Sequence, residues 1–290
     1  MVNLEKLKFY RKLVLIAVFS NDFLMDKFVL KGGSAIELIY KLDSRASVDI
    51  DLSMEDTFSE EELQEVSDIL RNSLDEVFRN EGLVIFDFKL SKRPKKISPE
   101  LESFWGGYSL EFKIYKADQQ DVIDSNLDYA RRSAEDIGLD GGKKLTIDIS
   151  NFEYCSDKKP IDLDGYTIYV YTPVMIVLEK LRAICQQMKE YQLNKGESRS
   201  PRPRDFYDIY TIINHYGIEF DDDEIDLLKK IFAIKKVDLS LLKLIPDYYA
   251  FNKQDLPSLT ATIPVDKRAT FDFDVCFNCV TKLVDGIKID

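Results

Sequence analysis

Apolar residues in the first part of the chain follow two different spacings. A spacing near 3.6 residues predicts amphipathic helices over residues 4–23 and 59–80. Ser59 followed by Glu62 is a capping box, which marks the start of the second helix. Short apolar or alternating runs predict strands over residues 28–30, 47–52, 84–90, 108–115, 145–149 and 168–171. These elements together predict an α/β (α+β) domain, a mixed sheet flanked by helices.

The pattern changes near residue 171. Thr172 and Pro173 form a typical helix start, because Thr caps a helix and Pro fits its first turn. Beyond this point helical spacing dominates up to residue 290, with one proline-containing interruption. We therefore predict two domains, residues 1–171 and residues 172–290, of which the second is mainly helical.

Composition restricts the function classes. The 290 residues carry a net charge of -12 and include one histidine, His215, and four cysteines. Such an acidic chain does not suit a protein that coats nucleic acid non-specifically, although a local basic face remains compatible with it. A single histidine removes most of the familiar nucleophile designs. The sparse cysteines, and the lack of a signal peptide or a long apolar run, predict a cytoplasmic protein without a membrane partner.

The first candidate for chemistry is Gly32-Gly33-Ser34, between the strand at 28–30 and a helix expected over residues 34–42. A glycine pair allows a tight turn and lets a ligand approach the main chain. The N-terminus of a helix favours a phosphate, and Ser34 would cap that helix and add a hydroxyl. By itself, a Gly-Gly turn is also common between a strand and a helix that bind no ligand.

The second candidate is the strand that follows. Alternation places Val48, Ile50 and Leu52 in the core, and Ser47, Asp49 and Asp51 together on the other face. Two carboxylates this close repel each other unless a cation lies between them, and hard oxygen ligands select Mg²⁺ or Mn²⁺. An isolated pair of aspartates is also compatible with a half-exposed strand. Together with the glycine turn, however, it predicts a site for a metal-bound nucleoside triphosphate.

These motifs resemble a known signature. Leu30-Lys-Gly-Gly-Ser-Ala-Ile36, followed by Arg45-x-Ser47-x-Asp49-x-Asp51, looks like the polymerase-beta-type nucleotidyltransferase motif and resembles the AbiEii/AbiGii toxin family more closely. The similarity continues at Tyr171-Thr-Pro173, Glu179-Lys-Leu-Arg-Ala183, Arg204-Asp-Phe-Tyr-Asp-Ile-Tyr210 and Phe271-Asp-Phe-Asp274. The resemblance implies a nucleotidyltransferase fold and transfer of an NMP from an NTP to an acceptor.

The resemblance also implies roles for individual residues. Nucleotide contacts would come from Gly32, Gly33, Ser34, Ser47 and Lys180, metal binding from Asp49 and Asp51, and the family's essential lysine and aspartate match Lys180 and Asp205. A lysine near the start of a helix could direct a point charge at a triphosphate, although a salt bridge to a neighbouring carboxylate would also explain Lys180. Asp205 suits the positioning of Lys180 or of a nucleotide hydroxyl better than metal binding.

Many enzymes of this fold have a third carboxylate on a neighbouring strand. The candidates are Asp148, in the alternating run at 145–149, and Glu111, in the run at 108–115. We favour Asp148 as a metal ligand and catalytic residue because of its place late in the sheet, but the spacing alone leaves both open.

The acceptor and the partner are further expectations from the resemblance. Members of the family act as toxins in abortive infection, some by adding nucleotides to the 3′ end of tRNA, and such a toxin is normally encoded beside its antitoxin. Candidate RNA contacts are Lys92, Arg93, Lys95, Lys96, Arg199, Arg202 and Arg204. A protein hydroxyl as acceptor would suit the acidic composition, and a non-catalytic nucleotide-binding protein would keep the same fold.

Overall fold

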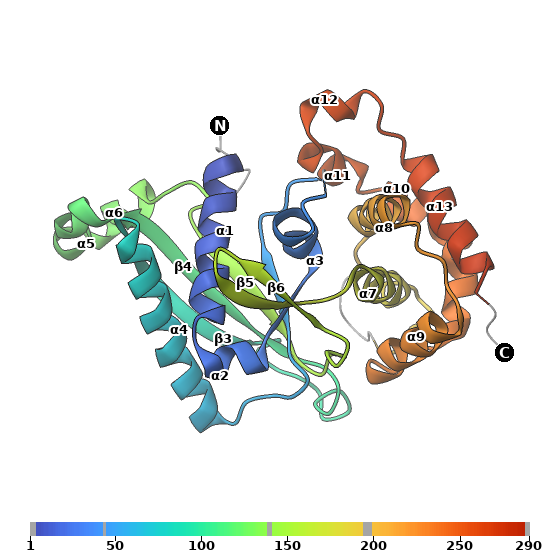
Figure 1. Cartoon of the computed structure of the whole chain (residues 1–290), viewed down its shortest axis with the longest axis horizontal. Coiled ribbons are helices and arrows are strands. Elements are labelled where there is room, and N and C mark those ends of the chain that lie inside the picture. The colour runs from blue at the N-terminus through green and yellow to red at the C-terminus, as the bar shows by residue number, and fades with distance from the viewer. Residues whose placement is uncertain (1–3, 43–44, 138–140, 194–198, 288–290) are drawn as a thin grey trace. The chain divides into compact units, whose positions relative to one another are not determined.

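The computed structural model describes residues 4–42, 45–137, 141–193 and 199–287, which form two compact units (Figure 1). The first unit comprises Met1–Ile39 and Ser47–Val170, and the second comprises Tyr40–Ala46 and Tyr171–Asp290. The short segment Tyr40–Ala46 therefore belongs to the second unit, although the chain on both sides of it belongs to the first.

The first unit is built on a mixed sheet of seven strands, which confirms the six predicted strands and adds β6, an edge strand that the sequence pattern did not indicate. The strand order is β3-β4-β5-β2-β1-β7-β6. The β2–β5 and β1–β7 pairs are parallel and the other pairs are antiparallel. The strands are β1 (Val29–Lys31), β2 (Ile50–Ser53), β3 (Leu83–Arg93), β4 (Gly107–Lys116), β5 (Leu145–Ser150), β6 (Lys159–Leu163) and β7 (Tyr166–Val170).

The two faces of this sheet differ in character. Leu30, Leu52 and Ile149 are paired in register across β1, β2 and β5, and all three are buried. Their neighbours along each strand point to the opposite face, where Asp51 and Asp148 lie. The alternation of apolar and polar residues therefore produces one core face and one polar face, and the candidate aspartates lie on the polar face.

Helices α1 (Leu4–Phe19) and α4 (Glu60–Asn80) pack against the apolar face (Figure 1). An aromatic series joins them to the sheet: Tyr10 of α1 contacts Phe78 of α4, which in turn packs edge-on against Phe112 of β4. Smaller helices of this unit are α2 (Asp22–Lys27), α3 (Gly32–Ser34), α5 (Gln120–Ser125) and α6 (Leu127–Ser133).

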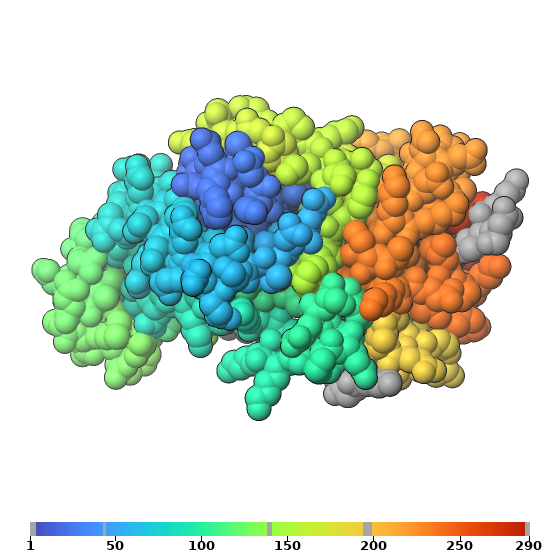
Figure 2. Space-filling model, turned by 90° about the horizontal axis from the view of Figure 1, so that it is seen from below, coloured from blue at the N-terminus to red at the C-terminus, as the bar shows by residue number. Residues whose placement is uncertain are grey.

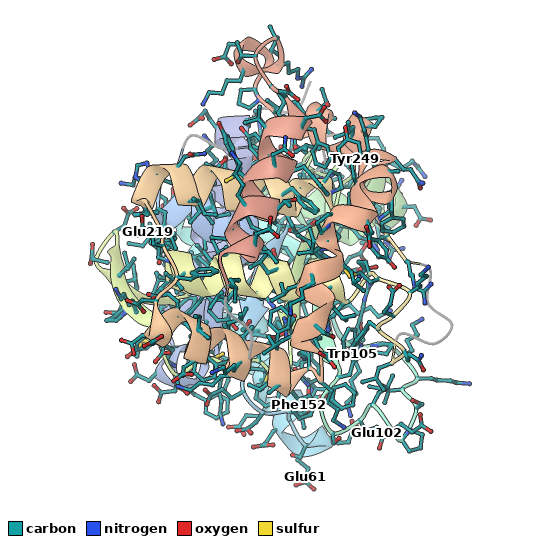
Figure 3. All side chains as sticks on the ribbon, turned by 90° about the vertical axis from the view of Figure 1, so that its right-hand side faces the viewer. Glu61, Glu102, Trp105, Phe152, Glu219 and Tyr249 are labelled. Atoms are coloured by element: carbon teal, nitrogen blue, oxygen red, sulfur yellow. The ribbon has the colours of Figure 1, made fainter. Side chains whose placement is uncertain are left out.

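The second unit is helical. Its longer helices are α7 (Pro173–Cys185), α8 (Pro203–Tyr216), α9 (Asp222–Ile234) and α13 (Phe273–Asp285), and its shorter ones are α10 (Tyr249–Lys253), α11 (Leu256–Thr262) and α12 (Val265–Arg268). Figure 3 shows the side chains of these helices, with Glu219 and Tyr249 labelled. The helix α7 begins as predicted, because the Thr172 hydroxyl accepts a hydrogen bond from the Met175 N–H at 3.2 Å. Among the described residues, no helix is both long enough and apolar enough to span a bilayer.

Candidate active site

The glycine turn brings its main chain directly against Asp51. Gly32 has a φ of +66°, in the left-handed region that favours glycine. A Cβ atom at this position would lie 2.3 Å from Asp51 Oδ2, so any side chain here would displace the Asp51 carboxylate. Two independent constraints therefore favour glycine here, the positive φ and the position of the Asp51 carboxylate beside the turn.

Ser34 does not cap a helix, contrary to the sequence prediction. The helix begins at Gly32, two residues earlier, and α3 ends at Ser34. The Ser34 hydroxyl is fully buried, donates to the Asp49 carbonyl oxygen at 2.7 Å and accepts from Arg11 Nη1 at 3.2 Å. This hydroxyl therefore ties the glycine turn to the segment that carries Asp49.

The helix predicted over residues 34–42 is also different in the structure. After α3 the chain forms a π-helix, Ala35–Ile39, and Tyr40 already belongs to the second unit. Apolar residues spaced three and four apart are common to both helix types, so the sequence pattern does not separate them. Since the α-helical part has only three residues, a helix dipole contributes little here.

The segment before β2 departs from the predicted alternation. The strand begins at Ile50 rather than at Ser47, and Asp49 is exposed just before it. Ser47 is buried instead of being presented beside Asp49, and Val48 is half-buried. The reason is local bonding: the Ser47 N–H donates to Glu37 Oε2 at 3.2 Å, and its hydroxyl donates to the Asp49 carbonyl at 3.3 Å.

The register of the sheet separates the two candidates for the third carboxylate. Asp148 of β5 is directly paired with Asp51 of β2, so their side chains leave the same face of adjacent strands. Glu111 lies one strand further away, on β4, and forms ion pairs with Lys144 at 2.8 Å and Arg93 at 3.1 Å. The hydrogen bond from Lys144 lowers the pKa of Glu111. Asp148 is thus the neighbour of Asp51, whereas Glu111 is held by two cations.

Further polar groups line the same face of the sheet. Lys31, paired in register with Asp51, is buried and contacts the Ser150 hydroxyl at 3.2 Å and Glu153 at 3.5 Å. The hydroxyls of Ser53 and Ser109 are buried and have no hydrogen-bond partner among the described residues. Lys31 was not among the predicted site residues, although its position on a short strand just before the glycine turn places it on this polar face.

The candidate residues of the helical half form a closed cluster of charges within the second unit. Lys180 of α7 places its amino group 2.8 Å from carboxylate oxygens of both Asp205 and Asp208 of α8. Arg45 binds Asp208 with two nitrogens, at 2.8 and 3.0 Å, and Arg202 forms an ion pair with Asp205. Lys180, Asp205 and Asp208 are all buried, so the salt bridge considered for Lys180 is present.

The pKa values of Lys180 and Asp205 show that ion pairing outweighs burial in this cluster. Burial alone would lower the pKa of Lys180, but the carboxylates of Asp205 and Asp208 outweigh it and raise that pKa. Burial alone would raise the pKa of Asp205, but Arg202 and Lys180 outweigh it and lower that pKa well below its usual range. The charged forms are therefore the stable forms of both residues.

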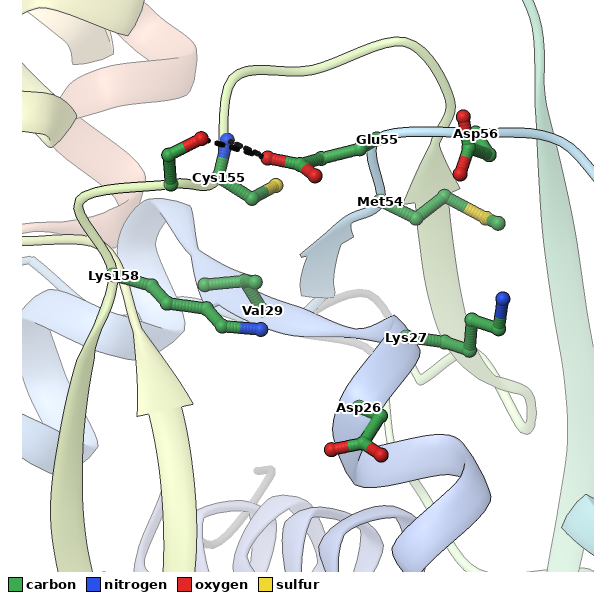
Figure 4. A pocket seen from close by; sticks show the side chains of 9 residues that line it. Asp26, Lys27, Val29, Met54, Glu55, Asp56, Cys155 and Lys158 are labelled. Atoms are coloured by element: carbon green, nitrogen blue, oxygen red, sulfur yellow. Dashed lines mark hydrogen bonds between the residues drawn. The ribbon is translucent and has the colours of Figure 1, made fainter.

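A separate pocket of about 220 Å³ lies in the first unit, at the opposite end of β1 from the glycine turn (Figure 4). Glu55 is fixed there by the Cys155 N–H at 3.3 Å and by the Ser156 hydroxyl at 3.1 Å. Lys27, Lys158, Asp26 and Asp56 also line it. None of the predicted site residues lines this pocket, so it is separate from the site that the motifs predict.

The basic residues considered for RNA binding are partly occupied by other contacts. Lys92 pairs with Glu60, Arg93 with Glu111 and Arg202 with Asp205, whereas Arg199 and Arg204 contact carbonyl oxygens. Lys95 and Lys96 are exposed in the loop between β3 and β4, which lies at the surface of the first unit in Figure 2. Figure 3 labels Glu102 and Trp105 of the same loop.

Comparison with known proteins identifies the family of the chain. A profile described as "Nucleotidyl transferase AbiEii toxin, Type IV TA system" matches residues 13–262. The solved structure of JHP933 from Helicobacter pylori is similar at 16% identity and a TM-score of 0.49, covering 98% of this chain and 92% of that one. An antigenic nucleotidyltransferase-like protein from Paracoccidioides brasiliensis is similar at 15% identity and a TM-score of 0.40, covering 87% and 94%. No curated protein sequence matches the chain.

Proposed function

Because the chain belongs to the AbiEii family of nucleotidyl transferase toxins from Type IV toxin–antitoxin systems, we propose that it transfers an NMP from an NTP to an acceptor hydroxyl with Mg²⁺ or Mn²⁺. The observation that carries the proposal is the close approach of Asp51 to Gly32. A carboxylate beside a main chain that has no side chain in the way suits a metal-bound triphosphate.

Asp51 and Asp148 are the residues proposed to hold the metal, with Asp49 beside them. Within the described residues, no group of three His, Cys, Asp or Glu side chains is arranged to hold an ion on its own. This fits Mg²⁺, which nucleotide sites commonly bind through one or two carboxylates together with substrate phosphates and water. When bound, the ion would supply neutralisation of the triphosphate charge and acidification of the attacking hydroxyl.

The residues of the chain itself act by positioning. The main chain at Gly32 and Gly33 is proposed to face the phosphates. The Ser34 hydroxyl holds that turn to the Asp49 segment, and the Ser47 hydroxyl bonds to the Asp49 carbonyl within the segment. Asp148, which is exposed, is proposed to accept the proton of the attacking hydroxyl. The hydroxyl oxygen bonds to the α-phosphorus as the bond to the bridging oxygen breaks, and pyrophosphate leaves.

Lys180 and Asp205 are proposed to contribute through the charge cluster of the second unit. With two carboxylates 2.8 Å from its amino group, Lys180 fixes α8 against α7. The family's requirement for this lysine and aspartate, carried over by resemblance, is then explained by the position of α8.

The proposed acceptor is the 3′ end of tRNA, and Lys95 and Lys96 are the proposed contacts to its backbone. The family belongs to Type IV toxin–antitoxin systems, so the proposed partner is an antitoxin encoded beside this chain. The proposed role of the pair is defence against phage. A protein hydroxyl is the second candidate acceptor, favoured by the net charge of -12, which suits polyanionic RNA less well.

The test is incubation of the protein with each labelled NTP, total cellular RNA and total protein. Asp49→Ala and Asp51→Asn should reduce incorporation by about a thousandfold, since both remove charge at the metal. Asp75→Asn, which changes an exposed carboxylate on α4, is the matched control and should be fully active. Transfer to tRNA should fall steeply with salt, because phosphate contacts release counterions.

The destination of the label then decides between acceptors. Label in a tRNA band supports the first candidate and label in protein supports the second. Mg²⁺-dependent binding of an NTP without any incorporation would indicate a non-catalytic protein, and equal incorporation by wild type and Asp51→Asn would remove the proposed metal site.

A further inference from the structure

One arginine outside every motif is buried beneath the glycine turn. Arg11 lies on α1, on the same apolar stripe as Leu7 and Val14, and is 1% exposed. Its Nε has no hydrogen-bond partner among the described residues, which is unfavourable for a buried donor. The position is therefore not optimised for stability alone, because an apolar residue would avoid that cost.

The two terminal nitrogens of Arg11 bind two residues of the turn region. Nη1 donates to the Ser34 hydroxyl at 3.2 Å, and Nη2 donates to Glu37 Oε2 at 2.6 Å. Glu37 lies on the π-helix, one turn after Ser34, and its side chain is largely buried. The planar guanidinium thus fixes the relative positions of two side chains that leave the same stretch of chain.

Both of these partners continue to the segment before β2. Ser34 donates to the Asp49 carbonyl at 2.7 Å, and Glu37 accepts from the Ser47 N–H at 3.2 Å. Arg11 therefore binds two residues, Ser34 and Glu37, each of which forms a hydrogen bond to the segment 47–49. Through them it connects the chain at and just after the glycine turn to that segment. Asp51 follows two residues later, with its carboxylate against Gly32.

We propose that Arg11 is a positioning residue for nucleotidyl transfer, which sets the distance between the glycine turn and the aspartate segment through Ser34 and Glu37. This inference rests on the proposed function. It makes Ser34 a bridge between the two motifs, with Arg11 as the residue that orients its hydroxyl. Displacement of the aspartates by an ångström would reduce the rate without abolishing nucleotide binding.

The test compares Arg11→Lys with Arg182→Lys. Lysine keeps the charge but lacks the fork that reaches two acceptors. Arg182 is a matched control in the second unit, since it is 2% exposed and pairs with Glu179 at 3.1 Å. Both variants should unfold at a lower temperature than wild type. Arg11→Lys alone should show a kcat about 10- to 100-fold lower and a higher Mg²⁺ concentration for half-maximal rate, with a nearly unchanged KM for the NTP.

A double-mutant cycle tests whether Arg11 acts through Ser34. If Arg11 acts through Ser34, the effects of Arg11→Lys and Ser34→Ala on kcat should be strongly non-additive. Should Arg11→Lys not fold, Glu37→Gln, which keeps an acceptor oxygen and removes the charge, should raise the Mg²⁺ requirement in the same way. Equal kcat and equal Mg²⁺ requirement in Arg11→Lys and Arg182→Lys, or additive effects in the cycle, would overturn the inference. An inactive wild type would instead count against the proposed function.

Discussion

The candidate aspartates of the first unit and those of the second unit are held in different ways. In the first unit, Asp51 and Asp148 are paired in register on adjacent strands, and Asp148 is exposed. In the second unit, Asp205 and Asp208 are buried and bound by Lys180, Arg45 and Arg202.

The difference indicates which cluster has capacity for a ligand. A buried carboxylate that already accepts from two or three cations has few oxygen lone pairs left, whereas an exposed carboxylate beside a second one can bind a metal ion. This contrast supports the proposal that a ligand binds at the first cluster and that the second cluster stabilises its unit. The following predictions test that division.

Asp208→Asn should have the largest effect on stability. Asp208 is 1% exposed and is shared by Lys180 and Arg45, so the change leaves the buried Lys180 and the half-buried Arg45 without their common anion. We expect a loss of about 3–5 kcal/mol in the free energy of unfolding, measured by urea denaturation. Asp75→Asn, which breaks the exposed pair with Arg79, should cost less than about 1 kcal/mol. Similar losses in the two variants would show that the second cluster is not what stabilises its unit.

Gly32→Ala should separate the backbone effect from the effect on Asp51. The alanine must adopt a φ of +66° and its Cβ would displace the Asp51 carboxylate. Gly82→Ala is the matched control, since its φ is +70° and an added Cβ meets nothing within 4 Å.

Both alanine variants should lose about 1–2 kcal/mol of stability from the left-handed conformation. Only Gly32→Ala should also lose NTP incorporation, by about a hundredfold. Full activity of a folded Gly32→Ala protein would separate Asp51 from the chemistry.

The smallest effect is the dependence of stability on pH in the second cluster. The folded-state pKa of Asp205 is lowered, so its contribution is present above the unfolded value of about 3.9 and is lost as the pH falls through the folded value. The pKa of Lys180 is raised, so its contribution is complete below about 10.4 and is lost as the pH rises through the folded value.

Thermal unfolding should therefore show a broad plateau with a decline at each end. Asp205→Asn should have a shallower decline on the acid side than wild type. An unchanged acid limb in that variant would assign the decline to other carboxylates.

The alternating pattern was sufficient to predict the mixed sheet and to place Asp51 and Asp148 on its polar side, because period-2 spacing determines which face a residue occupies. It could not predict that the strand starts at Ile50, since that depends on the bond from Ser47 to Glu37. Arg11 was missed because one charge within an apolar stripe gives no spacing signal. Its contacts with Ser34 and Glu37 are 23 and 26 residues away in the chain.

In the helical half, too, the sequence pattern could not predict the long-range contacts. The sequence left two interpretations open for Lys180, a triphosphate contact and a salt bridge, because spacing alone gives no burial. The sequence around Arg45 did not indicate its partner Asp208, which is 163 residues further along the chain. Local patterns therefore predicted the elements and the motif positions, whereas the contacts that fix the charges depend on packing over long sequence distances.

The assignment of Tyr40–Ala46 to the second unit has a consequence for the order of synthesis. The segment lies between the glycine turn and the aspartates, yet its partners Asp208 and Thr262 leave the ribosome long after it does. Until those residues are synthesised, Arg45 and Ala46 lack these two contacts. Complete packing of this link therefore requires the chain to be translated at least to the end of α11, so the two motifs are synthesised together but acquire their last contacts much later.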